Sequence, residues 1–147
     1  MTNTHQNLQA AFAGESQAHV KYRYFAKICK EQGFDDLAEH FWQTAEQELL
    51  HAWAHLELLH NNITARECLE QAIAGETYEY TTMYPEFVKQ AQAERDYVQA
   101  QEMMLQTAES QEHATKFLEL LNTAAKRFKA LVNVERKHAE QYKKFGE

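Results

Sequence analysis

The fold is decided by a short motif that occurs twice. Residues Ala11–Ser16 read AFAGES, and Ala72–Thr77, 61 positions later, read AIAGET. A second pair of segments follows in the same order, with ELLHA at Glu48–Ala52 and ERKHA at Glu135–Ala139. Each half of the chain therefore contains a Gly-Glu segment and then a segment with Glu and His three residues apart. Two such halves predict a pseudo-symmetric bundle of helix pairs.

The composition favours long helices in a single domain. The 147 residues include four Gly and one Pro, far below the usual share of roughly 12% for these two residues, so few turns are expected. A hydrophobic content of 44% suits one domain over residues 1–147 with an ordinary core. The polar N-terminus lacks a signal peptide's apolar stretch, and no segment is long and apolar enough to span a membrane, so we expect a cytoplasmic protein.

Charge and cysteine content exclude several classes of partner and site. The 22 acidic and 15 basic residues give a formal net charge of −7, which disfavours nucleic acid and membranes as partners because both need basic surfaces. Cys29 and Cys68 stand apart, and no CxxC pair occurs, which argues against a disulfide framework and against a cysteine-ligated metal. Cations are the ligands that this composition favours.

Few residues break the helical pattern in the first two thirds of the chain. We expect helices over residues 4–32, capped by Thr4 and ended by Gly33, and over residues 34–60. Thr64 and Glu67 then form a capping box, S/T-x-x-E, that starts a third helix. This helix contains Pro85, where a bend or a compensating partner for the freed carbonyl is expected.

The last part of the chain is predicted to form two helices. Residues 86–145 contain neither Gly nor Pro, but a helix of that length is too long for a domain of this size. Capping residues at Asp96 and at Asn122 divide the segment into helices near 96–121 and 123–146. The fold class expected is all-α, a four-helix bundle with one extra helix.

Several Glu and His residues lie on the apolar stripes of these helices. An unpaired buried carboxylate costs several kcal/mol or takes up a proton, so carboxylates on four core-facing stripes need a compensating cation or a shared proton network, and a metal cluster meets that need. Two Glu-x-x-His helices and two Glu-bearing helices form the ligand set of di-iron and di-manganese bundles. Carboxylate and imidazole ligands suit Fe, Mn or Zn. The stripe residues are Glu15, Glu48, His51, Glu76, Glu79, Glu135 and His138.

The same segments resemble the rubrerythrin family. The resemblance rests on FAGESQA at Phe12–Ala18, GETYEYTTMYP at Gly75–Pro85 and the two Glu-x-x-His motifs. It implies a ferritin-like fold and two Fe ions per site, with Mn or Zn as substitutes. It also implies that the stripe residues above are the metal ligands, and that Tyr22 and Tyr84 hydrogen-bond to ligating carboxylates. In this family the residue matching Glu79 lets one iron shift between a carboxylate and a histidine as the redox state changes.

Two ligand pairs are candidates for the fourth helix. Glu76 and Glu109 are 33 residues apart, as are Glu15 and Glu48. By this spacing Glu109 and His113 would be the ligands of the fourth helix, and residues 122–147 would extend the chain beyond the bundle. However, Glu109-x-x-x-His113 needs a local bulge, whereas the alternative keeps the Glu-x-x-His spacing on a continuous apolar stripe. We therefore expect Glu135 and His138.

The resemblance implies reduction of hydrogen peroxide to water by a non-haem di-iron peroxidase in oxidative-stress defence. Rubrerythrins usually continue into a rubredoxin domain, and none occurs before Glu147. The chain thus resembles the stand-alone erythrin type, which would take electrons from an external rubredoxin-like or flavin-linked donor. The alternatives are a ferroxidase or iron-handling protein, a catalase-like dimanganese enzyme, and a helical scaffold whose carboxylates are remnants.

The short connection between the halves predicts a dimer. Only 25 residues separate His51 from Glu76, and about six of them remain for the connection. Six residues reach about 20 Å, whereas parallel second and third helices would require about 30 Å. We therefore expect a homodimer with exchanged helix pairs, in which Glu15, Glu48 and His51 of one chain meet the remaining ligands of the other.

Overall fold

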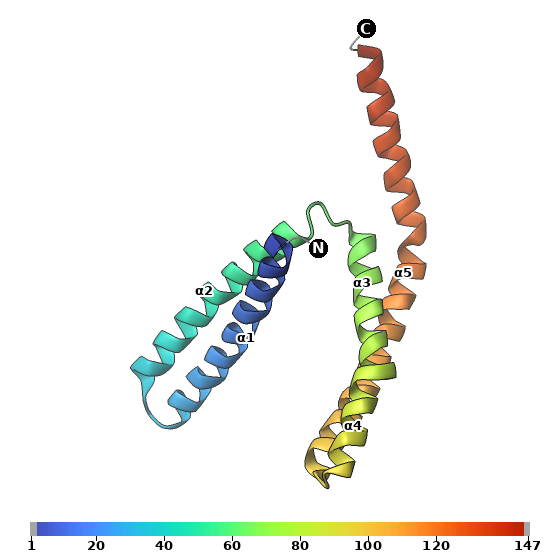
Figure 1. The fold of residues 1–147 in the computed structure, drawn as a ribbon. Helices are drawn as coiled ribbons and strands as arrows, with labels where there is room; N and C mark the ends of the chain where they lie inside the picture. Colours follow the sequence, from blue (N-terminus) through green and yellow to red (C-terminus); the bar gives the residue numbers. More distant parts are fainter. Residues whose placement is uncertain (1–2, 146–147) are drawn as a thin grey trace. The chain divides into compact units, whose positions relative to one another are not determined.

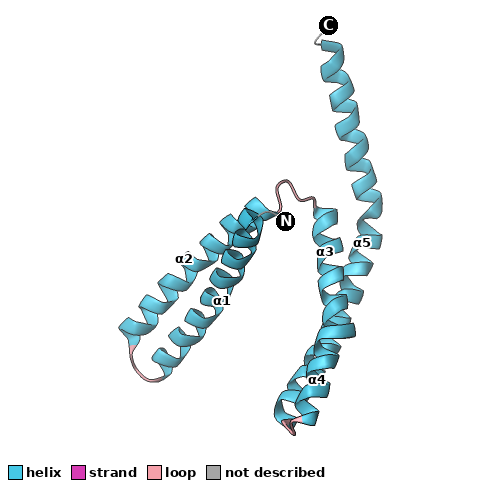
Figure 2. Ribbon diagram, in the orientation of Figure 1, coloured by secondary structure: helices cyan, strands magenta, loops and turns pink. Residues whose placement is uncertain are grey.

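The computed structural model describes the backbone of residues 3–145, and the side chains as far as Val134 together with Arg136 and Lys137. Within this range the chain is helical and contains no strand, which confirms the all-α fold class (Figures 1 and 2). The elements in chain order are α1 (Asn3–Glu31), α2 (Asp35–Leu59), α3 (Ala65–Tyr78), the π-helical η1 (Glu79–Met83), α4 (Tyr84–Ala93) and α5 (Tyr97–Phe145).

The chain divides into two compact units, Met1–Ile63 and Thr64–Glu147. The first unit is the pair α1 and α2, and in the second unit α3, η1 and α4 pack along α5. The repeated motif therefore corresponds to two helix pairs, as the sequence predicts. That the two units belong to one domain over residues 1–147 stays a prediction.

In the first unit, α1 and α2 are joined by a tight turn and pack through alanines. Gly33 has a φ of 83° and ends α1 in a Schellman motif, in which Phe34 N–H donates to the Cys29 carbonyl at 2.9 Å and Gly33 N–H to Lys30 at 3.1 Å. The start of α1 differs from the prediction because Thr4 lies inside the helix rather than at its cap. The side chains buried between the two helices are small, which allows a close approach of the backbones: Ala26, Ala38, Ala45 and Ala52.

The second unit begins with the predicted capping box and then contains a π-helical turn. Glu67 N–H donates to Thr64 Oγ1 at 3.2 Å, and Thr64 N–H donates to Glu67 Oε2 at 2.8 Å. In η1 the Tyr84 N–H donates to the carbonyl of Glu79, five residues earlier. Pro85 follows η1 in the first turn of α4 and supplies no backbone N–H to the turn before it. The wider turn is the local departure from α-helix that accompanies this proline.

The last helix is continuous, and the predicted break at Asn122 is wrong. The earlier break is confirmed, since Asp96 Oδ1 accepts a hydrogen bond from Gln99 N–H at 3.1 Å at the start of α5. At the second position, Thr123 Oγ1 donates to the Leu120 carbonyl at 3.0 Å within an unbroken helix of 49 residues. Asn and Thr can cap a helix but do not oblige it to end. The expected extra helix is therefore the C-terminal part of α5.

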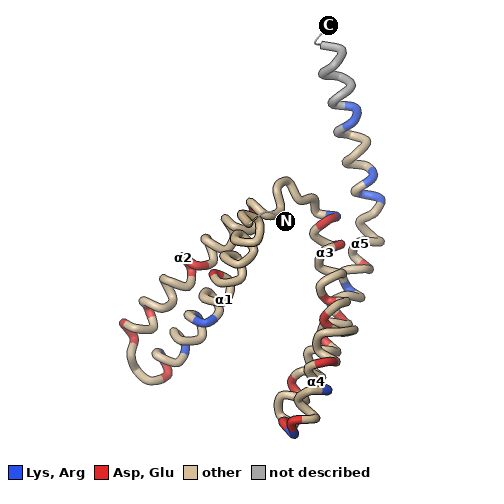
Figure 3. The backbone as a smooth tube through the Cα atoms, in the orientation of Figure 1, with Lys and Arg blue, Asp and Glu red and all other residues tan. Residues whose placement is uncertain are grey.

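Charge is unevenly distributed along the second unit. Acidic residues are frequent along α3 and α4, whereas the described C-terminal part of α5 carries basic side chains (Figure 3). The net charge of −7 therefore conceals a basic helical segment, a distribution that composition alone does not reveal. Its described members are Lys126, Arg127, Lys129, Arg136 and Lys137.

Candidate metal centre

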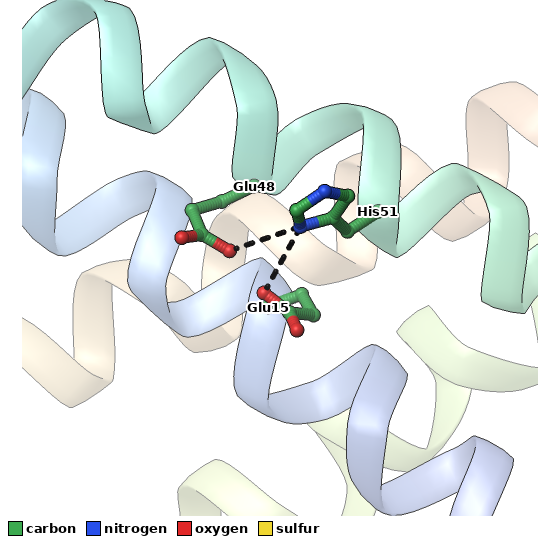
Figure 4. Close-up of side chains that lie close together, drawn as sticks. All are labelled: Glu15, Glu48 and His51. Atoms are coloured by element: carbon green, nitrogen blue, oxygen red, sulfur yellow. Dashed lines mark ion pairs between the residues drawn. The ribbon is translucent and has the colours of Figure 1, made fainter.

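The first unit brings three predicted ligands together. Glu15 lies on α1, and Glu48 and His51 lie on one face of α2 because they are three residues apart. His51 Nδ1 is 3.5 Å from Glu48 Oε2 and 3.9 Å from Glu15 Oε2 (Figure 4). One ligand atom from each residue lies within 4.8 Å of the others. This arrangement can hold a cation between the two helices.

The electrostatics of this group show a local excess of negative charge. A hydrogen bond to Glu48 raises the pKa of the Glu15 carboxyl, and partial burial and the charge of Glu48 raise it further. The positive charges of His51 and His55 act in the opposite direction on the pKa of Glu15. Two carboxylates this close to each other create negative charge that a metal ion can neutralise. His55 was not among the predicted ligands, although it follows His51 by one helical turn.

The second unit forms its own carboxylate and histidine pair between two helices. Glu76 on α3 places Oε1 3.4 Å from Nδ1 of His113 on α5. Glu79, the first residue of η1, accepts a hydrogen bond through Oε2 from Ser110 Oγ on α5 at 2.9 Å. One short stretch of α5 therefore contacts both Glu76 and Glu79.

Of the two ligand pairs considered for the last helix, only Glu109 and His113 have side chains in the described part of the structure. The side chains of Glu135 and His138 lie outside the described residues. Glu109 and His113 lie on an uninterrupted α-helix, in which residues four apart share a face. No bulge interrupts α5 between Glu109 and His113, and which of the two pairs binds metal stays a prediction.

The two predicted tyrosines have different surroundings. The ring of Tyr22 is half-buried between Phe25 and Phe41, with centroids 6.3 and 5.9 Å away. Burial raises the pKa of the Tyr84 phenol, and the charges of Glu79 and Glu76 raise it further, followed by those of Glu102 and Glu109. Tyr84 is therefore held in its protonated, hydrogen-bond-donating form beside the acidic residues of the second unit.

Ser110 is the site residue that sequence reasoning missed. A single serine within a helix carries no periodic signal, and its only sequence clue is its position directly after Glu109. Its role depends on the packing of η1 against α5.

The rubrerythrin family model matches residues 6–121 of this sequence. The chain belongs to the rubrerythrin family. The family resemblance inferred from the sequence motifs is thus confirmed. The matched segment contains Glu109 and His113 and ends before Glu135 and His138.

Among its relatives, the rubrerythrin of Porphyromonas gingivalis is 36% identical over 134 residues, which cover 82% of this chain and 66% of the relative. Nigerythrin of Nitratidesulfovibrio vulgaris is 40% identical over 106 residues, 63% of this chain and 52% of the relative. The chain thus spans two thirds or less of the length of these two rubrerythrin-family proteins. The solved structure of fully reduced, all-ferrous nigerythrin is 31% identical, with 83% of this chain and 67% of that chain covered and a TM-score of 0.42.

Among the described residues, none of the helices combines the length and apolar character that a membrane span requires.

Proposed function

We propose that this rubrerythrin-family chain is a non-haem di-iron peroxidase that reduces hydrogen peroxide to water. The observation that supports the proposal best is that each helix pair has a carboxylate–histidine group of its own. In the first unit this group is Glu15, Glu48 and His51, and in the second Glu76 contacts His113. Two metal ions per site call for such a duplicated donor set.

The donor set of the first unit fits an iron ion. Carboxylate oxygens and one imidazole nitrogen are ligands that Fe accepts, with Mn or Zn as substitutes. The ligand atoms lie within 4.8 Å of one another, and the hydrogen bond to Glu48 that raises the pKa of Glu15 indicates negative charge that a cation would neutralise.

The proposed ligand set departs from the sequence prediction on α5. We retain Glu15, Glu48, His51, Glu76 and Glu79, and we replace Glu135 and His138 with Glu109 and His113. The contact between Glu76 and His113 supports the replacement. A second support is the family match, which ends at residue 121.

The chemistry combines the bound metal with nearby proton donors. Two iron ions, when bound, supply the two electrons that break the O–O bond of hydrogen peroxide. Two protons must also be delivered, so that both oxygen atoms leave as water. The Tyr84 phenol is protonated at neutral pH, and burial and the neighbouring carboxylates raise its pKa further, so Tyr84 is proposed to donate a hydrogen bond at the site. Tyr22 is proposed to do the same from the first unit.

Electrons would come from an external rubredoxin-like protein or flavoprotein. A homodimer with exchanged helix pairs is proposed as the assembly, because only five residues connect Leu59 at the end of α2 with Ala65 at the start of α3. That connection reaches about 20 Å at most. A cytoplasmic location stays a prediction.

The peroxidase proposal is tested by comparing peroxide turnover with iron uptake. The iron-loaded protein is supplied with a reduced rubredoxin and hydrogen peroxide, and peroxide and protein-bound iron are followed together. We expect many peroxide molecules consumed per site at a constant iron content. Consumption that stops after about one equivalent, with iron accumulating on the protein, would instead identify a ferroxidase.

A further inference from the structure

Ser110 is a polar residue, yet its side chain is buried in the second unit. It is 4% exposed, and among the described residues it is the one polar or charged residue classed with the buried core. It lies on α5 between Glu109 and the turn that carries His113, where η1 packs against the helix. A buried hydroxyl needs a hydrogen-bond partner, and the identity of that partner shows what the residue does.

The partner of Ser110 is not the usual one for a hydroxyl inside a helix. Such hydroxyls commonly donate to the carbonyl four residues earlier, as Ser16 does to Phe12 at 2.7 Å and Thr107 does to Met103 at 2.7 Å. Ser110 Oγ instead donates to Glu79 Oε2 at 2.9 Å, across 31 residues of sequence. The hydroxyl therefore links α5 to a carboxylate of the other helix.

We infer that Ser110 is a positioning residue that fixes the carboxylate of Glu79 for metal binding. The inference rests on the proposed di-iron function. With Oε2 engaged by Ser110, Oε1 is the oxygen offered to a cation, which favours binding through one oxygen. A hydrogen bond to a charged carboxylate is stronger than one between neutral groups. It also restricts the rotamers of Glu79 before a metal ion binds, so that less side-chain entropy is lost on binding.

The two units differ in how their carboxylates are held. In the first unit, Glu15 and Glu48 are hydrogen-bonded to each other, and both lie close to His51. Glu79 begins a π-helical turn, and the contact that orients it comes from another helix. Partners that orient ligating carboxylates typically change metal affinity 10- to 100-fold when they are removed. Ser110 is expected to act at the lower end of this range because it contributes a single hydrogen bond.

The test is an anaerobic calorimetric titration of the full-length, metal-free protein with Fe²⁺. Ser110→Ala should weaken the affinity for one of the two ions by about tenfold and leave the other within twofold. Thr107→Ala is the matched control, because its hydroxyl bonds its own helix one turn away, and it should bind both ions like the wild type. In a Glu79→Ala background, Ser110→Ala should have no further effect on either affinity.

Other results would overturn the inference in distinguishable ways. Wild-type affinities in Ser110→Ala, or an equal loss with and without Glu79, would show that Ser110 acts only in packing. If Ser110→Ala does not fold, Ser110→Cys keeps nearly the same volume with a weaker donor, and wild-type binding by that variant would overturn the role equally. A wild-type protein that binds fewer than two ions per site would contradict the proposed function and, with it, this inference.

Discussion

The two helix pairs place similar side chains by different means. In α1 and α2 the carboxylate and histidine that approach each other most closely, Glu48 and His51, lie on one regular helix. In the second unit the corresponding contact joins Glu76 on α3 to His113 on α5. Helical periodicity alone therefore determines the first contact, whereas the second exists only because two helices pack in a particular axial register.

The second unit also departs from regular helix where the first does not. α1 and α2 are unbroken, but the helix that carries Glu76 and Glu79 widens into η1 before α4. π-helical turns of this kind are frequent at functional sites. We therefore expect the second unit, with its π-helical turn, to contain the more specialised residues of the proposed site. Experiments that test this expectation are ordered from the largest expected effect to the smallest.

The largest effect is expected from Glu48→Ala. Loss of this carboxylate, one of the three candidate ligands grouped in the first unit, should abolish two-iron loading, because it removes both a ligand and negative charge that would hold the cations. Metal analysis after anaerobic loading measures the result. Glu46→Ala is the control: Glu46 lies on the same helix in an exposed pair with Arg23 at 3.9 Å, so loading should be unchanged. Full loading of Glu48→Ala would remove the first unit from the proposed site.

A second experiment separates the two histidines considered for the last helix. His113→Ala should weaken binding of one iron at least roughly tenfold, because an imidazole ligand of the second unit is lost. His138→Ala should bind both ions with wild-type affinity. Calorimetric Fe²⁺ titration of both variants gives the answer, and the reverse pattern would reinstate Glu135 and His138.

A third experiment asks whether one chain completes the site of another. A Glu15→Ala, Glu48→Ala chain is co-refolded with a Glu76→Ala, Glu109→Ala chain, each being defective in a different unit. Exchange of helix pairs should restore one intact site per heterodimer, or about half of the wild-type iron and activity at full pairing. Chains that each form their own site would recover neither.

A fourth experiment compares Thr64, which caps α3, with Thr123, which lies next to a predicted helix start but is inside α5. The expected effect on stability is smaller than the effects above. Thr64→Ala should lower the free energy of unfolding by about 1 kcal/mol, because Thr64 caps α3. Thr123→Ala lies inside α5 and should change it by less than about 0.5 kcal/mol. Urea unfolding of the metal-free proteins measures both values. Equal losses would indicate a helix start at residue 123.

The smallest expected effect concerns pH and belongs to the first unit. The hydrogen bond to Glu48 raises the pKa of Glu15 in the folded protein, so protonation of Glu15 should stabilise the metal-free fold at acidic pH. This stabilisation is lost as the pH rises through the raised value of the folded state. Glu48→Gln removes one charge and should flatten that dependence, which unfolding across the acidic range measures. An unchanged pH profile would show that the two carboxyls do not share a proton.

Much of the local structure could be predicted from individual residues. The capping box of Thr64 and Glu67, the turn at Gly33 and the helix start at Asp96 all depend on contacts within a few residues. Such contacts form in the same way in almost any tertiary setting. The break predicted at Asn122 failed because capping residues permit a helix to end but do not force it, and no Gly or Pro lies between Glu86 and Phe145.

The sequence by itself determined the all-helical fold, its two halves and the grouping of Glu48 with His51, because helical periodicity is a local property of the backbone. It could not determine which turn of α5 lies opposite Glu76, since both candidate ligand pairs offer Glu and His on that helix. Only the tertiary structure decided this, because the axial register of α3 against α5 is set by side-chain packing along both helices. The same register brings His113 to Glu76 and Ser110 to Glu79.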